Sequence, residues 1–275
     1  MNYCTYKPPK ILSDIVCHYW TLDGNVSIGH TYIHRTLANF CPELIFHYGG
    51  PFEELVSENR TETTFTTGIH GQTNQIRRFT AKEKYGIFGV LLQPYAIPIL
   101  FGMPSTEIKN ELVDLTLLGQ DGKDLCDQML SAKDNAQRLQ IINCFLTQRI
   151  MEFERPEIVF AAQRIYNLNG LANVKNLADQ SSLSQRQFER KFKEHIGFSP
   201  KSFARIVRFK SLINKYKRGI QHLPKLRMTS VIMIRPTSFR ISNSFQGTIL
   251  MLTSRGKPGR FFTHHRMSIF SNFGL

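Results

Sequence analysis

The first hundred residues show short stretches in which apolar and polar positions alternate, separated by Gly, Pro and Asn. Alternation with a period of two is typical of half-buried strands, and these punctuating residues favour turns between them. The pattern predicts strands over residues 17–22, 27–34, 42–49, 65–71 and 85–94. We therefore expect a small sandwich or barrel-like sheet in residues 1–103.

From about Pro104 the apolar residues recur at helical spacing instead. Ser105 is expected to cap a helix over residues 106–115, and further helices are expected over 122–132 and 134–151. The last of these has an apolar face made of Leu139, Ile142, Phe145, Leu146 and Ile150. Residues 1–155 thus read as one domain, β-rich over 1–103 and helical over 104–155. A hinge at 154–156 then leads into a helix over 157–168, with Pro156 suited to its first turn.

Residues 173–197 have the pattern of two short helices joined by a tight turn. Asn173 stands where the first helix needs an N-cap, and the turn falls at residues 180–182. Ser184 and Gln187 have the spacing of a capping box at the start of the second helix. Gly197 is suited to its C-terminal end. This is the helix-turn-helix pattern, whose second helix enters the major groove of DNA.

The second helix of this pattern has one apolar and one polar face. Phe188 and Phe192 form the inward stripe. Arginine can donate two hydrogen bonds to guanine, whereas Lys supplies a point charge that suits phosphate. We expect Arg186 and Arg190 to reach base edges and Lys193 to contact the backbone. The complete candidate DNA-binding set is Gln185, Arg186, Gln187, Glu189, Arg190, Lys193, Lys201 and Arg205.

The charge of the chain is distributed unevenly. Residues 1–155 hold 14 Lys and Arg against 17 Asp and Glu, whereas residues 156–220 hold 13 against 4. Residues 221–275 hold 8 basic residues and no acidic one. A basic C-terminal half indicates a polyanion partner, and a helix-turn-helix suits double-stranded DNA better than a membrane. An exposed basic helix can also be a merely solvated face, and the charge of the surrounding domain is what favours DNA.

Other kinds of site have little support in the sequence. The five cysteines are scattered without metal-ligand spacing, which favours reduced thiols and a cytoplasmic protein. No apolar run is long enough to span a bilayer. His18, His30, His34 and His47 lie among the expected strands with Glu43, but partly buried or surface histidines explain them better than a metal site. No catalytic residue, metal or cofactor is predicted, and the chain is not expected to be an enzyme.

The stretch LADQSSLSQRQFERKFKEHIGFSPKSFARIVRFKSL closely resembles the first half of the DNA-binding domain of AraC/XylS-type transcription regulators. The upstream segments CPELIFHYGG, TGIHGQ and FGVLLQPYAIPILFGMPSTEIKNELVDL resemble a domain of unknown function that precedes this module in many bacterial members. The resemblance implies that Ser199-Pro200 starts a long linker helix leading to a second helix-turn-helix. It also implies a small-molecule effector, of no stated identity, at the N-terminal domain.

The sequence departs from the family pattern where the second helix-turn-helix is expected. Residues 220–275 contain no acidic residue and no clean helical stripe, and Pro224, Pro236 and Pro258 interrupt any long helix. This composition is typical of DNA translated in the wrong frame, and the alternative is a genuine divergent tail. From Gln221 the neighbouring frame can encode a second AraC-type helix-turn-helix, with LTEIAY followed by DQTHF. Because Met has a single codon, Met228-Thr229 and Met233-Ile234 must each give Asp there, and the family pattern accepts both.

The sequence therefore predicts an α+β protein of three parts. These are an N-terminal sensor or regulatory domain (1–155), a first helix-turn-helix with its linker helix (156–219), and a frameshifted, poorly ordered basic tail (220–275). The expected function is that of a DNA-binding transcription regulator that reads the major groove with helix 184–194, impaired by the loss of its second helix-turn-helix. The alternative is a small-molecule sensor or interaction module that does not bind DNA. The sequence assigns no oligomeric state.

Overall fold

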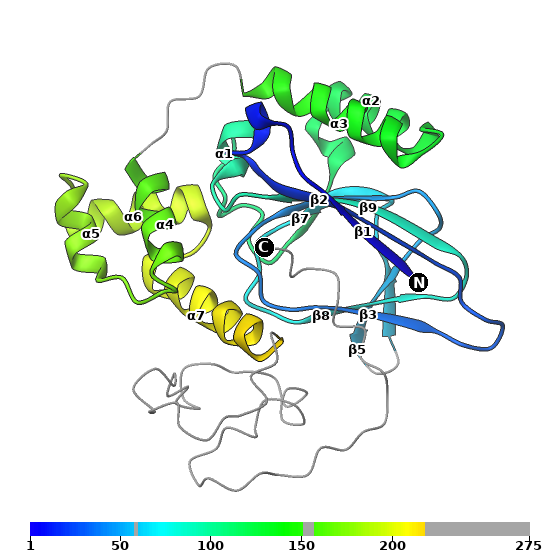
Figure 1. Ribbon diagram of the computed structural model, residues 1–275, viewed down its shortest axis with the longest axis horizontal. Coiled ribbons are helices and arrows are strands. Elements are labelled where there is room, and N and C mark those ends of the chain that lie inside the picture. The colour runs from blue at the N-terminus through cyan, green and yellow to red at the C-terminus, as the bar shows by residue number, and fades with distance from the viewer. Residues whose placement is uncertain (58–59, 151–156, 218–275) are drawn as a thin grey trace, which may run out of the picture.

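The computed structural model describes residues 1–57, 60–150 and 157–217. The chain has an α+β fold in which a β-rich body is followed by helices, as the sequence predicts. Figure 1 shows the strands at the centre and right, helices that follow the strands above them, and the last helices of the described chain grouped at the left. The predicted hinge at 154–156 and the predicted frameshifted tail at 220–275 lie outside the described residues.

The strands form two antiparallel sheets. The six-stranded sheet has the order β1-β2-β9-β4-β7-β10, and the four-stranded sheet has the order β3-β8-β5-β6. The bounds of the larger sheet are β1 (Asn2–Tyr6), β2 (Val16–Gly24), β9 (Tyr85–Leu92), β4 (Glu43–His47), β7 (Thr67–His70) and β10 (Leu112–Asp114). Those of the smaller sheet are β3 (Tyr32–Thr36), β8 (Arg77–Ala81), β5 (Glu53–Ser57) and β6 (Arg60–Thr63).

Four of the five predicted strands are confirmed, as β2, β4, β7 and β9, whereas the strand predicted over 27–34 coincides with β3 only at residues 32–34. The sequence pattern missed the other five because they are short or polar. Strand β6 reads RTET and is exposed along its whole length, so it has no apolar alternation to reveal it.

The central strand β4 is buried at all five positions, because each of its faces meets a separate core. Leu44 and Phe46 join a cluster that includes Leu125 and Ile142. These two come from α2 (Gln120–Ser131) and α3 (Asn135–Arg149), which cover this face of the sheet (Figure 1). Ile45 packs in the second cluster, between the two sheets, with Trp20, Phe52 and Phe79 among others. Strands buried on both faces lose strict alternation, which is why this one reads as a continuous apolar run.

The helix predicted over residues 106–115 is wrong. This segment makes turns, then forms β10, and then a 3₁₀ helix over Leu115–Leu118. Its backbone groups bond across to β7 and its flank, since Asn110 N donates to Gln72 O and Gly71 N donates to Glu111 O. Long-range pairing has replaced the local helical bonds, and Ser105 caps no helix of its own. A short helix that was not predicted, α1 (Ala96–Phe101), lies before this segment.

The remaining helices lie where the sequence places them: α4 (Glu157–Asn167), α5 (Val174–Gln180), α6 (Gln185–Ile196) and α7 (Pro200–Lys217). Their apolar faces join the larger cluster of the β-rich body, because Phe40 packs edge-on against Phe203 and Tyr166. Within the ranges that the structure describes, no helix is long and apolar enough to cross a membrane.

Candidate nucleic-acid interface

The helix pair α5–α6 forms from local capping bonds. The side-chain oxygen of Asn173 accepts from Lys175 N at 2.9 Å and from Asn176 N at 3.4 Å, which satisfies the free amides of the first turn of α5. The connection then turns at Ser182, whose φ of 51° is in the left-handed region. Ser181 closes the preceding turn by donating its hydroxyl to Leu177 O at 2.8 Å.

Helix α6 begins with the capping box that its sequence predicts. Ser184 Oγ accepts from Gln187 N at 3.3 Å, and Gln187 Oε1 accepts from Ser184 N at 3.0 Å. Phe188 and Phe192 are fully buried, as expected, and their ring centroids lie 5.7 Å apart. The inward stripe fixes which side of α6 faces outward. The side-chain carbonyl oxygen of Gln187 accepts a hydrogen bond in this cap, which is the role that the sequence pattern also indicates for it.

The polar face of α6 is open to solvent. Gln185, Arg186, Gln187, Arg190 and Lys193 are exposed, and Glu189 is half-buried. Arg186, Arg190 and Lys193 follow each other at intervals of four and three, so they lie along one side of the helix. Within residues 1–57, 60–150 and 157–217, no ion pair involves any of these three. Their charges are therefore available to an external anion.

The other two candidates lie on a different helix. Lys201 is exposed in the first turn of α7, and Arg205 is half-buried one turn later. Ser199 caps this helix, accepting from Ser202 N at 3.3 Å. The candidate set is thus divided between α6, which carries six residues, and α7, which carries two.

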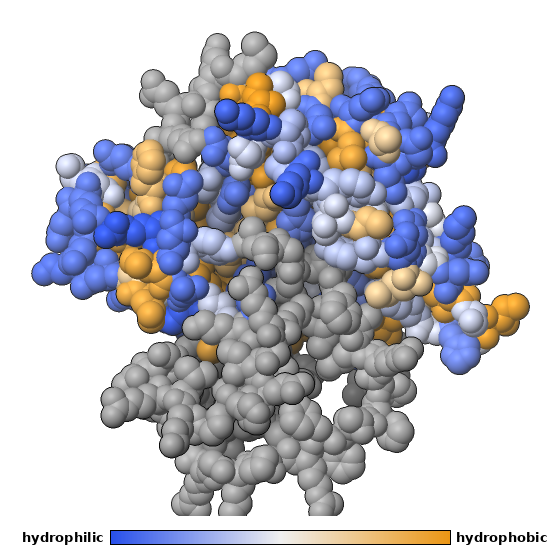
Figure 2. All heavy atoms as spheres, viewed as in Figure 1, coloured by the Kyte–Doolittle hydropathy of each residue, from blue (hydrophilic) through white to orange (hydrophobic). Residues whose placement is uncertain are grey.

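Figure 2 shows hydrophilic side chains along the outer edge of the group α4–α7, interrupted by hydrophobic patches. Exposed apolar residues in this group include Phe160, Leu168 and Leu171. They belong to α4 and the loop after it, so they do not interrupt the polar face of α6.

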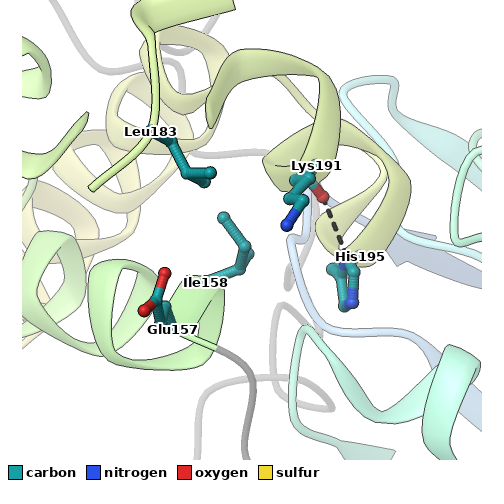
Figure 3. Close-up of a pocket in the computed structure, with 5 residues that line it drawn as sticks. All are labelled: Glu157, Ile158, Leu183, Lys191 and His195. Atoms are coloured by element: carbon teal, nitrogen blue, oxygen red, sulfur yellow. Dashed lines mark hydrogen bonds between the residues drawn. The ribbon is translucent and has the colours of Figure 1, made fainter. Parts of the chain in front are cut away.

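A cavity of ≈ 370 Å³ lies between the start of α4 and α6. Figure 3 shows Ile158 and Leu183 at its centre, with Glu157 on one side and Lys191 and His195 on the other. His195 Nδ1 lies 2.9 Å from Lys191 O, so the ring is held against its own helix. Acidic and basic groups face each other across a small apolar floor, and none of these residues is in the candidate set.

The C-terminal end of α6 is held by residues that sequence reasoning did not assign to the site. Gly197 N donates to Lys193 O within the helix, but the next three carbonyls bond to the β-rich body. Ser105 N donates to Glu194 O at 2.8 Å, and Ser105 Oγ donates to His195 O at 2.7 Å. Gln72 Nε2 donates to Ile196 O at 2.9 Å. No local signal reveals these bonds, because the partners are 90 and 124 positions apart in the chain.

The titratable groups inside the β-rich body are buried, unlike the exposed cations of α6. Burial lowers the pKa of His34 and of His47 to about 4 and that of His70 to about 3, and it raises the pKa of Glu43 to about 8. Of the histidines named as candidates from the sequence, His18, His34 and His47 are buried and His30 is exposed. In the part of the chain that the structure describes, no group of three or more His, Cys, Asp or Glu is placed to hold a metal ion.

Residues 4–114 match the family model of a domain of unknown function, DUF6597. This is less than half of the 275 residues, and it agrees with the resemblance of the upstream segments to a domain of that kind. No curated protein matches the sequence.

Similar solved structures include transcription regulators. An apo variant of ToxT from Vibrio cholerae is 11% identical, with 73% of this chain and 99% of that chain covered and a TM-score of 0.31. The AraC-like transcriptional activator CuxR is 10% identical, with 78% of this chain and 86% of that chain covered and a TM-score of 0.29. At these identities and TM-scores the match is a loose one and establishes no function.

Proposed function

We propose that this chain is a DNA-binding transcription regulator of the AraC/XylS type that reads the major groove with α6. One observation carries the proposal: the second helix of a capped helix-turn-helix presents Arg186, Arg190 and Lys193 on one exposed side. Its opposite side is anchored by buried phenylalanines, so these cations project from a rigid support. Such a face suits the acceptor-rich major groove of DNA.

Each candidate residue has a role in this proposal. Arg186 and Arg190 donate to guanine, and each is worth ~1–3 kcal/mol of discrimination against the wrong base. Gln185 and Gln187 contact bases or phosphates, and Glu189 accepts from a cytosine amino group or orients an arginine. The exposed cations Lys193 and Lys201, with Arg205, lie against the phosphate backbone, where they fix the register of the protein.

The proposed domains are those that the sequence predicts, with a regulatory domain over 1–155, the first helix-turn-helix and linker helix over 156–219, and a tail over 220–275. The regulator acts in the cytoplasm, and its N-terminal domain takes a small-molecule effector. We further propose that a shift of reading frame between about Ser211 and Gln221 replaced the second helix-turn-helix. Reading the coding DNA tests this directly, and stop codons throughout the neighbouring frame would rule it out.

A single helix-turn-helix makes about half of the contacts of the intact pair. Specific binding is typically ~4–10 kcal/mol stronger than non-specific binding, so the loss of one half removes most of that margin. We expect weak, salt-sensitive and poorly selective binding to duplex DNA. A gel-shift titration measures it, with the double variant R186A/R190A as the negative control. Tight, sequence-selective binding at physiological salt would contradict the loss of the second half.

The alternative function is a small-molecule sensor or interaction module that no longer binds DNA. The buried, partly unpaired polar groups of the body favour it, since His47 Nδ1 and His70 Nε2 have no hydrogen-bond partner among the described residues. If neither the unsubstituted chain nor R186A/R190A binds duplex DNA, this alternative is the better one.

A further inference from the structure

The two ends of α6 are capped in different ways. At its N-terminus, Ser184 and Gln187 form a cap from within the helix itself. At its C-terminus, the carbonyls of Glu194, His195 and Ile196 bond to the β-rich body. The last carbonyls of a helix have no intrahelical partner and carry its partial negative charge, so donors placed there stabilise the final turn.

The donors at this end are Gln72 and Ser105, and both are fully buried. Gln72 also ties them together, because its Nε2 donates to Ser105 O at 3.0 Å as well as to Ile196 O. Its Oε1 has no hydrogen-bond partner within the described ranges. Leaving a buried side-chain oxygen without a hydrogen bond costs free energy. The Gln72 amide nevertheless bonds two carbonyls, so we take its role to be holding those carbonyls in place.

Gly197 brings α6 close enough for this contact. Its φ is +81°, and a Cβ built there would lie 2.0 Å from Gln72 Nε2. Glycine therefore meets two requirements at once, the left-handed backbone that ends the helix and the close approach of the glutamine amide. The contact between α6 and the body is direct and leaves no room for a side chain.

A second contact holds the helix that follows. Lys210 of α7 donates its Nζ to Asn39 Oδ1 at 2.6 Å and lies 4.4 Å from the centre of the Phe40 ring. Asn39 is itself joined to Thr73, the neighbour of Gln72, by two backbone hydrogen bonds of 2.8 and 2.7 Å. The residues that hold α6 and α7 thus belong to one connected platform on the body.

We propose that Gln72 and Ser105 are positioning residues that supply the C-terminal cap of the DNA-reading helix, so that the β-rich body sets the direction in which α6 meets DNA. This inference rests on the proposed function of α6. In this scheme the body need not contact the exposed side chains of Arg186 and Arg190. It acts on them through the last turn of the helix, and any change in the body that moves the platform changes the presentation of Arg186 and Arg190.

The test compares two Gln→Met variants of the full chain. Q72M removes the amide that caps α6, and it also removes the unsatisfied oxygen, which limits the damage to folding. Q163M is the matched control, because Gln163 Nε2 of α4 also donates across to the body, at 3.3 Å to Tyr95 Oη rather than to a carbonyl of α6. Ser105→Ala is a milder second variant, since it deletes only the hydroxyl bond to His195 O.

Two quantities are measured: hydrogen exchange of peptides covering residues 190–197, and affinity for a duplex DNA pool at fixed salt. Two lost hydrogen bonds correspond to about a tenfold rise in exchange for Q72M, and S105A gives a smaller rise in the same peptides. We expect duplex affinity to fall about three- to tenfold for Q72M, and Q163M to leave both quantities unchanged. Unchanged exchange in both Q72M and S105A, or raised exchange with unchanged affinity, overturns the proposal.

The arginine variant separates this failure from failure of the proposed function. If R186A/R190A lowers duplex affinity and Q72M does not, α6 reads DNA without help from the body, and only the positioning proposal fails. If R186A/R190A has no effect on affinity, the proposed function itself fails, whatever the exchange measurement shows for Q72M.

Discussion

The N-terminal and C-terminal ends of α6 differ in where their stability comes from. The first end is closed by Ser184 and Gln187, which are three residues apart, and it forms wherever this stretch becomes helical. At the second end, the carbonyls of His195 and Ile196 are bonded by Ser105 and Gln72 from the β-rich body, and these bonds exist only while the body is folded and docked. We call the N-terminal end of α6 self-contained and its C-terminal end dependent. The exposed cations begin at the self-contained end, whereas the direction of the helix is set at the dependent end.

The largest effect is expected from the exposed arginines of α6, which lie between its two ends. Replacing both Arg186 and Arg190 by Ala should lower affinity for duplex DNA by ~2–6 kcal/mol, because each arginine can supply ~1–3 kcal/mol. Arg164→Ala is the control, since this exposed arginine lies on α4. Fluorescence anisotropy titration measures the three affinities. A loss from R164A that is about half of the loss from the α6 double variant would show that only general charge matters, because R164A removes one positive charge and the double variant removes two.

Acidification should weaken the body and hence the dependent end. The pKa of His47 is lowered from 6.5 to about 4 by burial, so below pH 6.5 the unfolded chain binds a proton that the folded chain does not. The free energy of unfolding therefore falls as pH falls from 6.5 toward 4, and His34 and His70 act in the same direction. Glu43 acts oppositely, since its pKa of about 8 lowers stability as pH rises from 4.5 toward 8.

The contribution of His47 can be isolated by the variant His47→Leu. Between pH 6.5 and pH 5 the unsubstituted chain should lose about 2 kcal/mol more stability than H47L, at ~1.4 kcal/mol per pH unit. Urea unfolding followed by the fluorescence of Trp20, the single tryptophan, measures this difference. Replacement of the exposed His30 by Leu is the control, and identical pH profiles for H47L and the unsubstituted chain would contradict the expectation.

Gly197→Ala changes the dependent end of α6 directly. The left-handed backbone costs ~1–2 kcal/mol for a residue with a Cβ, and the contact with Gln72 adds to this. Gly102→Ala is a matched control, because Gly102 also ends a helix at positive φ, +66°, with nothing within 4 Å of a built Cβ. The excess destabilisation of G197A over G102A reports the docking contact, and thermal unfolding that shows no excess would count against it.

Ser184→Ala removes the cap at the self-contained end of α6 and should have the smallest effect on stability. Loss of an N-cap costs ~1 kcal/mol. Hydrogen exchange should rise in the first turn of α6 and stay unchanged in residues 190–197, because the C-terminal cap does not depend on Ser184. Equal fraying at both ends would indicate that the helix responds as one unit and that the two caps are not independent.

These two ends also show what the sequence can predict. The Ser184 cap, the Asn173 cap and the phenylalanine stripe depend on residues three or four apart, so the sequence predicts them and the structure confirms them. Ser105 has an equally good capping pattern, yet the expected helix after it is wrong. Its hydroxyl instead donates to His195 O, 90 residues away, and local capping chemistry cannot distinguish these two outcomes.

The same reasoning explains the strands and the body. Apolar alternation found β2, β4, β7 and β9, which border a core, but it missed β8, although Phe79 packs between the sheets. Strands β6 and β10 depend on pairing with neighbours that the pattern does not reveal. The burial of His34, His47 and Glu43 likewise follows from two sheets meeting face to face, which residue spacing does not report. The candidate DNA-binding residues stay a prediction, and the structure adds their exposure and the platform behind them.

The central claim is that α6 reads DNA through Arg186 and Arg190. Selection from a pool of randomised duplexes tests it most directly, with the full chain and with R186A/R190A treated in parallel at low salt. The account predicts that the unsubstituted chain enriches a short guanine-containing motif and that the double variant enriches none. Enrichment of the same motif by both proteins, or of no motif by the unsubstituted chain, would contradict it.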